Sequence, residues 1–301
     1  MSIKRFFLTS VLFWLSLLIG FSQCNLTTYL KDFDKSGTNV QSILKTESGI
    51  SAWDNLKKAG AELSDRTNYN LLKAISGDLG LVESWKVLQN TSFSTEIKWL
   101  ESFDALKKND LLKYVSEISD AEATAIHRYT IGNEELTRGA YRVNLTPEQQ
   151  EWIDLVNSGL DKLRPTKGYQ GKVFRGSNRP ESEIIERYVN VYHEGVARGI
   201  TPRVNEPPLL STSKSTNVAE YFISKGKRPD YAEVMFEMTS KRGVDIDDIS
   251  DYGKYLGPKN HPDKLIQQEV ILSNNQDYEI LDVIKSIKND GTIRYIIKLS
   301  E

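Results

Sequence analysis

The segment Leu209–Phe222 places the strictest constraint on the fold of this 301-residue chain, because it reads as a strand, a polar turn and a helix in immediate succession. Its two leucines follow two prolines, which cannot occupy a central strand, so a short buried strand is expected to begin after them. Thr216 or Asn217 can cap the following helix, and Gly226 can end it. The expected buried face of this helix consists of Val218, Tyr221 and Phe222.

The polar turn is the hydroxyl cluster Ser211-Thr212-Ser213. Taken alone, such a cluster at a strand end usually forms turns and helix caps. Two distant stretches accompany it: Lys172–Ser177, with Arg175 in a predicted strand, and Gln267–Leu272, with Glu269 in another. An arginine, a Ser-Thr-Ser cluster and a glutamate in this order resemble the bacterial mono-ADP-ribosyltransferase exoenzyme family, which includes toxins. The three motifs cover most of the C-terminal half of the chain.

The resemblance implies an α+β fold with NAD+ as co-substrate. Residues 24–115 are expected to form a helical domain for docking or delivery, with Trp53, Trp85 and Trp99 packed in its core. Residues 116–301 are expected to form the ADP-ribosyltransferase domain, with two packed, mainly antiparallel sheets around an NAD cleft. Periodicity and capping signals place its helices at 120–129, 146–163 and 181–198, a strand at 233–238, and a hairpin over 283–299.

Arg175 is expected to share one strand face with Val173, because side chains alternate along a strand. A guanidinium facing inward needs an anionic partner. That partner is either a structural carboxylate or the pyrophosphate of a dinucleotide, which the planar fork of arginine suits. Gly176 would then let the backbone approach the ligand closely. The resemblance makes Arg175 the NAD-binding arginine.

Glu269 is expected to face a cleft from an otherwise apolar strand, although an edge-strand charge is the simpler alternative. The resemblance makes it the catalytic glutamate and makes Ser211 its hydrogen-bond partner, while Thr212 and Ser213 hold the floor of the nicotinamide pocket. Cleavage of the nicotinamide–ribose bond passes through an oxocarbenium-like state, which a carboxylate stabilises.

Gln267 is expected on the same strand face as Glu269, about 7 Å away. Family members that modify arginine carry a second glutamate at this position, whereas glutamine can only form hydrogen bonds. The acceptor is therefore expected to be a protein side chain other than arginine. An NAD glycohydrolase that uses water, and a catalytically inactive module that binds NAD or a partner, stay open as alternatives.

A long polar loop is predicted from Val244 to Lys264, and loops of this length are usually functional. In the family that the sequence resembles, a loop at this position meets the protein substrate. Tyr252 and Tyr255 are the candidates for that contact. The protein substrate is expected in a host or competitor cell. A partner protein that neutralises the activity is a further possibility.

Residues 1–23 are predicted to be a signal peptide, because Lys4 and Arg5 precede an uncharged apolar run that ends at Gly20. The mature chain is then exported, and no later segment is apolar over the length of a membrane span. An N-terminal anchor, or a lipoprotein acylated at Cys24, are the alternatives. A single cysteine excludes an internal disulfide.

Other chemistries find little support in the composition. A formal net charge of −2 with no basic tract argues against nucleic-acid binding. Three histidines, one cysteine and no His-Glu-x-x-His pattern argue against a metal site. The glycine-rich phosphate-binding loops and the serine-nucleophile motif are missing as well.

Overall fold

The computed structural model describes residues 80–93, 96–132, 136, 145–260 and 266–301. The chain divides into two compact units between Glu101 and Ser102. The domain boundary predicted at 115/116 lies beyond this division and stays a prediction. The predicted signal peptide, Cys24 and Trp53 fall outside the described residues. Among the described helices, none combines the length and the apolar character that crossing a membrane requires.

The described part of the first unit is helical. Helix α5 covers Gly80–Leu88, and α6 covers Ile97–Lys108 and so continues into the second unit. Trp85 is buried, and Trp99 is buried with its ring stacked on Phe93 at 3.8 Å. The two tryptophans therefore pack in a core as predicted, while a role of this region in docking or delivery stays a prediction.

The second unit opens with short and long helices whose starts are encoded locally: η2 is Leu112–Val115, α7 is Asp120–Ile131 and α9 is Pro147–Lys167. Ser119 and Thr146 each begin a helix in a reciprocal capping box. The predicted cap at Thr146 is confirmed, and α9 runs past its predicted end. Helices α7 and α9 pack together, so closely at Gly159 that an added Cβ would lie 2.9 Å from Ile126.

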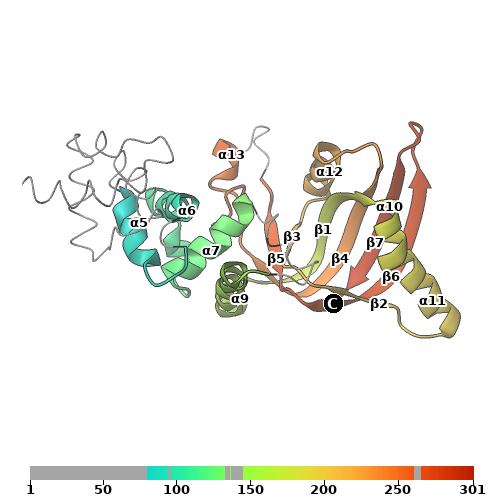
Figure 1. The fold of residues 1–301 in the computed structure, drawn as a ribbon, viewed down its shortest axis with the longest axis horizontal. Coiled ribbons are helices and arrows are strands. Elements are labelled where there is room, and N and C mark those ends of the chain that lie inside the picture. The colour runs from blue at the N-terminus through green and yellow to red at the C-terminus, as the bar shows by residue number, and fades with distance from the viewer. Residues whose placement is uncertain (1–79, 94–95, 133–135, 137–144, 261–265) are drawn as a thin grey trace, which may run out of the picture. The chain divides into compact units, whose positions relative to one another are not determined.

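Seven strands form the sheet of the described residues (Figure 1). Their bounds are β1 Gly168–Pro180, β2 Arg203–Glu206, β3 Leu210–Ser213, β4 Tyr231–Asp245, β5 Glu269–Leu272, β6 Gln276–Ile287 and β7 Ile293–Ser300. Their order is β1-β3-β5-β4-β7-β6-β2, and every pair is antiparallel except β4–β7. The predicted α+β class with mainly antiparallel strands is confirmed.

The two packed sheets that were expected are joined into one sheet by the hydrogen bonds among the described strands. Strand β4 pairs with β1 over most of its length and with β7 from Glu233 to Thr239, and Val244 and Asp245 also pair with β5. Strand β1 also reaches β3 through the pair Phe174 and Ser213. The 15 residues of β4 are long enough to serve both regions, so one connected network results.

The predicted helix 181–198 is interrupted by a π-helical turn: α10 is Glu181–Ile184, η3 is Ile185–Val189 and α11 is Asn190–Arg198. Gly199 ends it in the left-handed conformation at φ 66°, as predicted. These helices lie over the β6 and β7 side of the sheet, and α12, Thr216–Lys225, lies over β1 and β4 (Figure 1). The main core between the helices and the sheet includes Tyr188, Val234, Phe236, Met238 and Tyr278.

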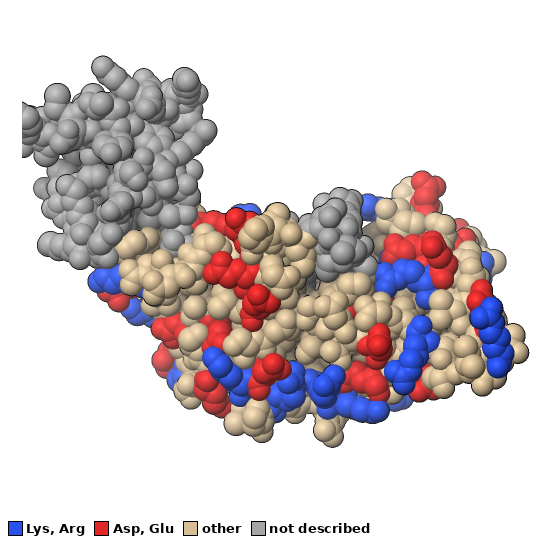
Figure 2. Space-filling view, turned by 60° about the horizontal axis from the view of Figure 1, so that its bottom comes forward, with Lys and Arg blue, Asp and Glu red and all other residues tan. Residues whose placement is uncertain are grey.

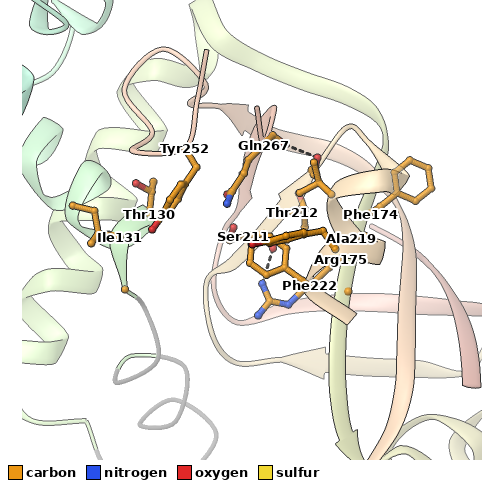
Figure 3. Close-up of a pocket in the computed structure, with 15 residues that line it drawn as sticks. Thr130, Ile131, Phe174, Arg175, Ser211, Thr212, Ala219, Phe222, Tyr252 and Gln267 are labelled. Atoms are coloured by element: carbon orange, nitrogen blue, oxygen red, sulfur yellow. Dashed lines mark hydrogen bonds between the residues drawn. The ribbon is translucent and has the colours of Figure 1, made fainter. Parts of the chain in front are cut away.

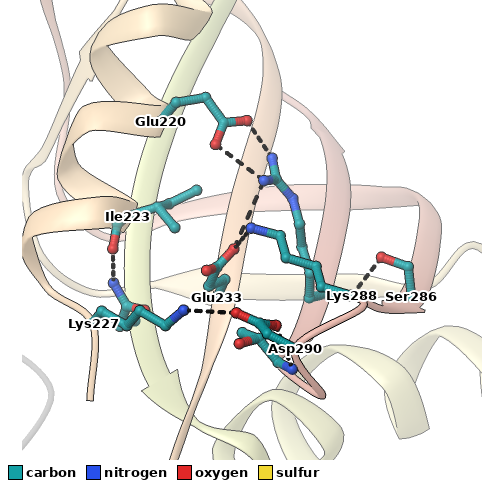
Figure 4. Close-up of polar contacts among 10 residues, drawn as sticks. Glu220, Ile223, Lys227, Glu233, Ser286, Lys288 and Asp290 are labelled. Carbon is teal, nitrogen blue, oxygen red and sulfur yellow. Dashed lines mark hydrogen bonds and ion pairs between the residues drawn. The ribbon is translucent and has the colours of Figure 1, made fainter. Parts of the chain in front are cut away.

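Charged side chains hold α12 and the β6–β7 hairpin to β4 (Figure 4). Glu233 of β4 is buried and receives Lys288 Nζ at 2.5 Å, while Arg294 binds Glu220 of α12. Lys227 pairs with Asp290 at the hairpin turn. On the face seen in Figure 2, acidic and basic side chains are interspersed. The prediction that the chain binds no nucleic acid stays a prediction.

Candidate functional site

A cavity of about 490 Å³ lies where α7, β1, β3, α12 and the segment before β5 meet (Figure 3). Its walls include seven of the nine predicted site residues: Arg175, Gly176, Ser211, Thr212, Ser213, Tyr252 and Gln267. These residues come from positions almost a hundred apart in the chain, and the fold brings them to one place. Glu269 and Tyr255 are the two that do not line the cavity.

The Ser-Thr-Ser cluster belongs to strand β3, and the prediction of a turn there is wrong. Its backbone pairs with β5, with Ser211 opposite Ile271 and Ser213 opposite Glu269, so a distant strand overrides the local turn preference. A side-chain hydroxyl of the cluster also bonds to β5: Thr212 Oγ1 donates to the carbonyl of Val270 at 2.6 Å. The cluster therefore links β3 and β5 through backbone and side-chain hydrogen bonds.

The end of β3 leads directly into α12. Ser213 Oγ donates to the carbonyl of Gln267 at 2.5 Å and accepts from the backbone N–H of Ser215 at 3.0 Å. Ser215 is the residue before the helix and makes no side-chain cap, so the predicted cap at Thr216 or Asn217 is wrong. Of the expected buried face, Val218 is buried, whereas Tyr221 and Phe222 turn toward the cavity.

The packing of α12 against β1 leaves room only for a glycine at position 176. A Cβ at this position would lie 1.9 Å from the carbonyl oxygen of Ala219 on α12. The close approach that the sequence predicted is therefore made by the protein's own backbone, although Gly176 also lines the cavity.

The carboxylate of Glu269 is held by two hydroxyls. Ser211 Oγ donates to Oε1 at 2.5 Å, and Ser250 Oγ donates to Oε2 at 2.7 Å. The side chain is only 1% exposed and lies behind Ser211, so the expected exposure to a cleft is wrong for this structure. Burial raises the pKa of Glu269, and the two hydroxyl bonds and the nearby charge of Arg175 offset only part of that rise.

Arg175 reaches into the cavity from β1 (Figure 3). Its Nη1 donates to the carbonyl oxygen of Ser211 at 2.6 Å, and its Nε is buried without a hydrogen-bond partner in the described part of the chain. The guanidinium forms no ion pair with a described carboxylate. A structural carboxylate, the simpler alternative considered for Arg175, is thus missing from the described residues, and an anionic ligand would supply what the buried donor lacks.

Gln267 lines the cavity, but it lies ahead of strand β5. Gln268 has a φ of +49°, so the chain turns at this point and strand alternation does not relate Gln267 to Glu269. The prediction of a shared strand face is therefore wrong, and the predicted spacing of about 7 Å stays a prediction. The backbone N–H of Gln267 donates to the carbonyl of Tyr252 at 2.9 Å. This bond joins the two residues that were predicted to meet the protein substrate and that line the cavity.

The two candidate tyrosines of the loop have different surroundings. Tyr252 lines the cavity, with its pKa raised by burial and by the charge of Asp251. Tyr255 stacks on Tyr114 with ring centroids 4.8 Å apart. The loop itself is shorter than predicted, because β4 continues to Asp245 and helix α13 covers Gly257–Asn260.

Two polar residues of the site lacked a distinctive sequence signal. Ser250 binds Glu269 from the polar loop predicted at 244–264, in which only Tyr252 and Tyr255 were candidate site residues. Thr130 lines the cavity, and its hydroxyl accepts from the backbone N–H of Asp251 at 2.9 Å. Both contacts join segments far apart in the chain, which periodicity cannot reveal.

A metal ion at this site would need a set of suitable side-chain ligands. Within the described ranges no three histidine, cysteine, aspartate or glutamate side chains gather in a way that would hold an ion. That the protein needs no metal remains a prediction. The donors that line the cavity are a guanidinium, hydroxyls and an amide, which suit phosphate and ribose groups.

No protein-family model matches the sequence, and no curated protein matches it either. Among solved structures, the ADP-ribosyltransferase HopU1 of Pseudomonas syringae pathovar tomato is similar at 18% identity over 67% of this chain and 87% of that one, with a TM-score of 0.47. The Vis toxin of Vibrio splendidus, an ADP-ribosyltransferase, shares 18% identity over 66% and 84%, with a TM-score of 0.43.

Exoenzyme S of Pseudomonas aeruginosa, solved with human 14-3-3 protein beta and carba-NAD, shares 22% identity over 66% and 88%, with a TM-score of 0.41. The resemblance to bacterial mono-ADP-ribosyltransferase toxins and effectors is thus confirmed as a likeness. Likeness at this level assigns no activity, so the function must be argued from the geometry of the cavity.

Proposed function

We propose that the protein is an exported, NAD-dependent mono-ADP-ribosyltransferase, a toxin or effector that transfers ADP-ribose to a protein side chain other than arginine. The observation that carries the proposal is an arrangement of three groups: a guanidinium that forms no ion pair with a described carboxylate and a serine hydroxyl both line one cavity, and the glutamate carboxylate that this hydroxyl binds lies directly behind the serine. Each of the three matches one requirement of NAD cleavage.

The cavity suits a dinucleotide in size and in chemistry. Its volume of about 490 Å³ falls within the range of about 300–1,000 Å³ that is usual for ligand pockets. The buried Nε of Arg175, which has no hydrogen-bond partner among the described residues, fits a pyrophosphate oxygen, because arginine binds phosphate through several donors of its planar fork. Tyr221 and Phe222 lie on the wall and offer aromatic surface to a ring of the ligand.

The reaction breaks the bond between the nicotinamide nitrogen and C1′ of the ribose. The bonding electron pair leaves with nicotinamide, and positive charge develops on the ribose. An acceptor then forms a new bond to C1′ and releases its proton. Glu269 stabilises the developing positive charge when it is ionised. Because burial raises its pKa, the rate should rise with pH until the carboxyl is deprotonated.

Glu269 must become accessible for this role. Ser211 lines the cavity and covers the carboxylate, so rotation of the serine side chain about its Cα–Cβ bond would expose Oε1 to a bound ribose. Catalytic groups often reach their working geometry only when the substrate is bound, so the covered state is compatible with catalysis.

A protein acceptor is favoured over water by the mouth of the cavity. Ile131 and Phe222 line the cavity and are 41% and 42% exposed. Exposed apolar side chains that gather at a site are typical of interaction surfaces. Gln267 faces the cavity with an amide, which can bind an amide acceptor but cannot deprotonate a guanidinium.

The test uses the purified mature chain and isotopically labelled NAD, with and without a cell lysate. Label on a lysate protein, lost in Glu269→Gln, supports the transferase. Nicotinamide release without protein labelling supports the alternative, an NAD glycohydrolase. If neither product forms and Glu269→Gln is indistinguishable from the wild type, only a catalytically inactive binding module remains.

A further inference from the structure

The carboxylate of Glu269 is held on two sides, and the two serines that hold it differ in their access to a ligand. Ser211 lines the cavity, where a bound molecule can engage its hydroxyl. Ser250 is 1% exposed and lies outside the cavity wall. A ligand that draws Ser211 away from Oε1 therefore leaves the 2.7 Å bond from Ser250 to Oε2 intact.

The segment that carries Ser250 is fixed on one side to the sheet. Ile246 N–H donates to the carbonyl of Glu269 at 3.1 Å, which ties the segment to the residue that Ser250 binds. The chain then winds tightly, because Ser250 N–H donates back to the carbonyl of Ile246 at 3.0 Å. At Gly253 an added Cβ would lie 2.0 Å from the carbonyl oxygen of Asp247, so the winding leaves no room for a side chain there.

Helix α7 fixes the same segment on the other side. Asp251, which follows Ser250, donates its backbone N–H to Thr130 Oγ1 at 2.9 Å. The carbonyl oxygen of Ile249, which precedes Ser250, lies 2.6 Å from Nδ1 of His127. Because a carbonyl oxygen can only accept, Nδ1 donates the proton of this bond, and burial lowers the pKa of His127. Both neighbours of Ser250 are thus anchored on α7.

We propose that Ser250 is a positioning residue of the site, which keeps the carboxylate of Glu269 aimed at the cavity when a bound ligand engages Ser211. The inference rests on the proposed function and deepens it. Groups held by a rigid surrounding shell keep the geometry that a reaction requires, and the anchored segment around Ser250 supplies such a shell for Glu269.

Removal of this hydroxyl has an electrostatic consequence. Burial raises the pKa of Glu269, the hydroxyls of Ser211 and Ser250 lower it, the charge of Asp247 raises it, and the charge of Arg175 lowers it. Loss of the Ser250 donor removes one of the lowering contributions. The pKa of Glu269 therefore rises further, and a smaller fraction of the carboxyl is ionised at a given pH.

The test is Ser250→Ala in the full chain. Loss of this hydrogen bond to the Glu269 carboxylate should lower kcat by about 10- to 100-fold. The acid limb of the kcat–pH profile should move to higher pH, while KM for NAD stays near the wild-type value, because Ser250 does not line the cavity. Ser250→Thr, which keeps a hydroxyl, should restore the acid limb. Ser250→Cys, a weaker donor of similar size, gives the same direction if the alanine variant does not fold.

Ser240→Ala is the matched control, since Ser240 is also buried, and its hydroxyl accepts from the backbone N–H of Gly243 instead of binding Glu269. The inference is overturned if Ser250→Ala keeps the wild-type kcat and acid limb, or if the control shifts both equally. Carboxyl NMR of Glu269 gives a second readout that needs no activity: its pKa should rise in Ser250→Ala. An unchanged pKa defeats the inference, whereas a wild type that neither labels protein nor releases nicotinamide defeats the proposed function.

Discussion

Two buried glutamates of this protein have similar hydroxyl partners and opposite acidities. Glu122 on α7 accepts from Ser119 Oγ at 2.9 Å and from Ser158 Oγ at 2.5 Å. Glu269 on β5 likewise accepts from two serine hydroxyls. Glu122 also receives Lys162 Nζ at 2.6 Å and the backbone N–H of Ser119 at 2.8 Å.

The additional donors decide the outcome. Burial raises the pKa of both carboxyls, but the lysine and the other donors around Glu122 outweigh it and lower its pKa to about 2. At Glu269 the hydroxyls do not outweigh burial, and the pKa is raised. Two hydroxyl hydrogen bonds therefore do not fully offset the desolvation of a buried carboxylate. A buried carboxylate with a raised pKa, such as Glu269, is typical of functional sites, whereas Glu122, which is paired with a lysine, stabilises the fold.

The largest expected effect separates the two glutamates by activity. Glu269→Gln should lower the rate of nicotinamide release from NAD by about 10²- to 10³-fold, the usual loss when an electrostatic stabiliser of a transition state is removed. Glu122→Gln should retain the wild-type rate at temperatures where it is folded, because Glu122 does not line the cavity. Equal losses in the two variants would break the comparison.

The next effect separates them by stability. Glu122 contributes about 3 kcal/mol of folding free energy at neutral pH, since its pKa falls from 4.5 to about 2 on folding. This contribution is present above the unfolded pKa and is lost as the pH falls from 4.5 toward 2. Glu122→Gln should therefore be destabilised by about that amount at neutral pH. Chemical denaturation at neutral and acidic pH measures it, and a loss that does not shrink in acid would contradict the assignment.

A smaller effect concerns the cation near each carboxylate. Lys162 binds Glu122 directly, whereas Arg175 aims Nη1 at the carbonyl of Ser211 and leaves Nε for a ligand. Arg175→Lys keeps the charge and loses the fork, so KM for NAD should rise by about tenfold with little change in kcat. Steady-state kinetics at fixed pH tests this. An unchanged KM would mean that Arg175 does not hold the dinucleotide.

The smallest expected effect has the opposite sign to that at Glu122. The raised pKa means that ionised Glu269 costs folding free energy at pH values above its folded pKa, and the cost disappears below the unfolded value of 4.5. Glu269→Gln should therefore be more stable than the wild type at neutral pH, with a gain that fades as the pH falls. Thermal unfolding across this range measures it, and a neutral-pH loss of stability would sink the explanation.

The sequence predicted the parts of this site that rest on local patterns. Helix starts at 120 and 147 follow from capping residues within one turn of each start, and the shared core face of Val234, Phe236 and Met238 follows from strand geometry. The family resemblance that Arg175, the Ser-Thr-Ser cluster and Glu269 carry implied that they meet. Arg175 and the cluster line one cavity, and Glu269 lies directly behind Ser211.

The errors arise where distant residues decide the local structure. The Ser-Thr-Ser cluster became a strand because β5 supplies its backbone partners, and Gln267 left the strand because Gln268 adopts a left-handed conformation. The role of Ser250 depends on a contact across 19 residues, which has no period in the sequence. Such contacts require the folded chain.

A crystal structure of the Glu269→Gln variant with NAD tests the account most directly, because the substrate should stay intact. The account predicts the pyrophosphate on the guanidinium of Arg175 and the nicotinamide ribose against Ser211 and position 269. A dinucleotide bound elsewhere, or one in this cavity with its ribose turned away from position 269, would contradict it.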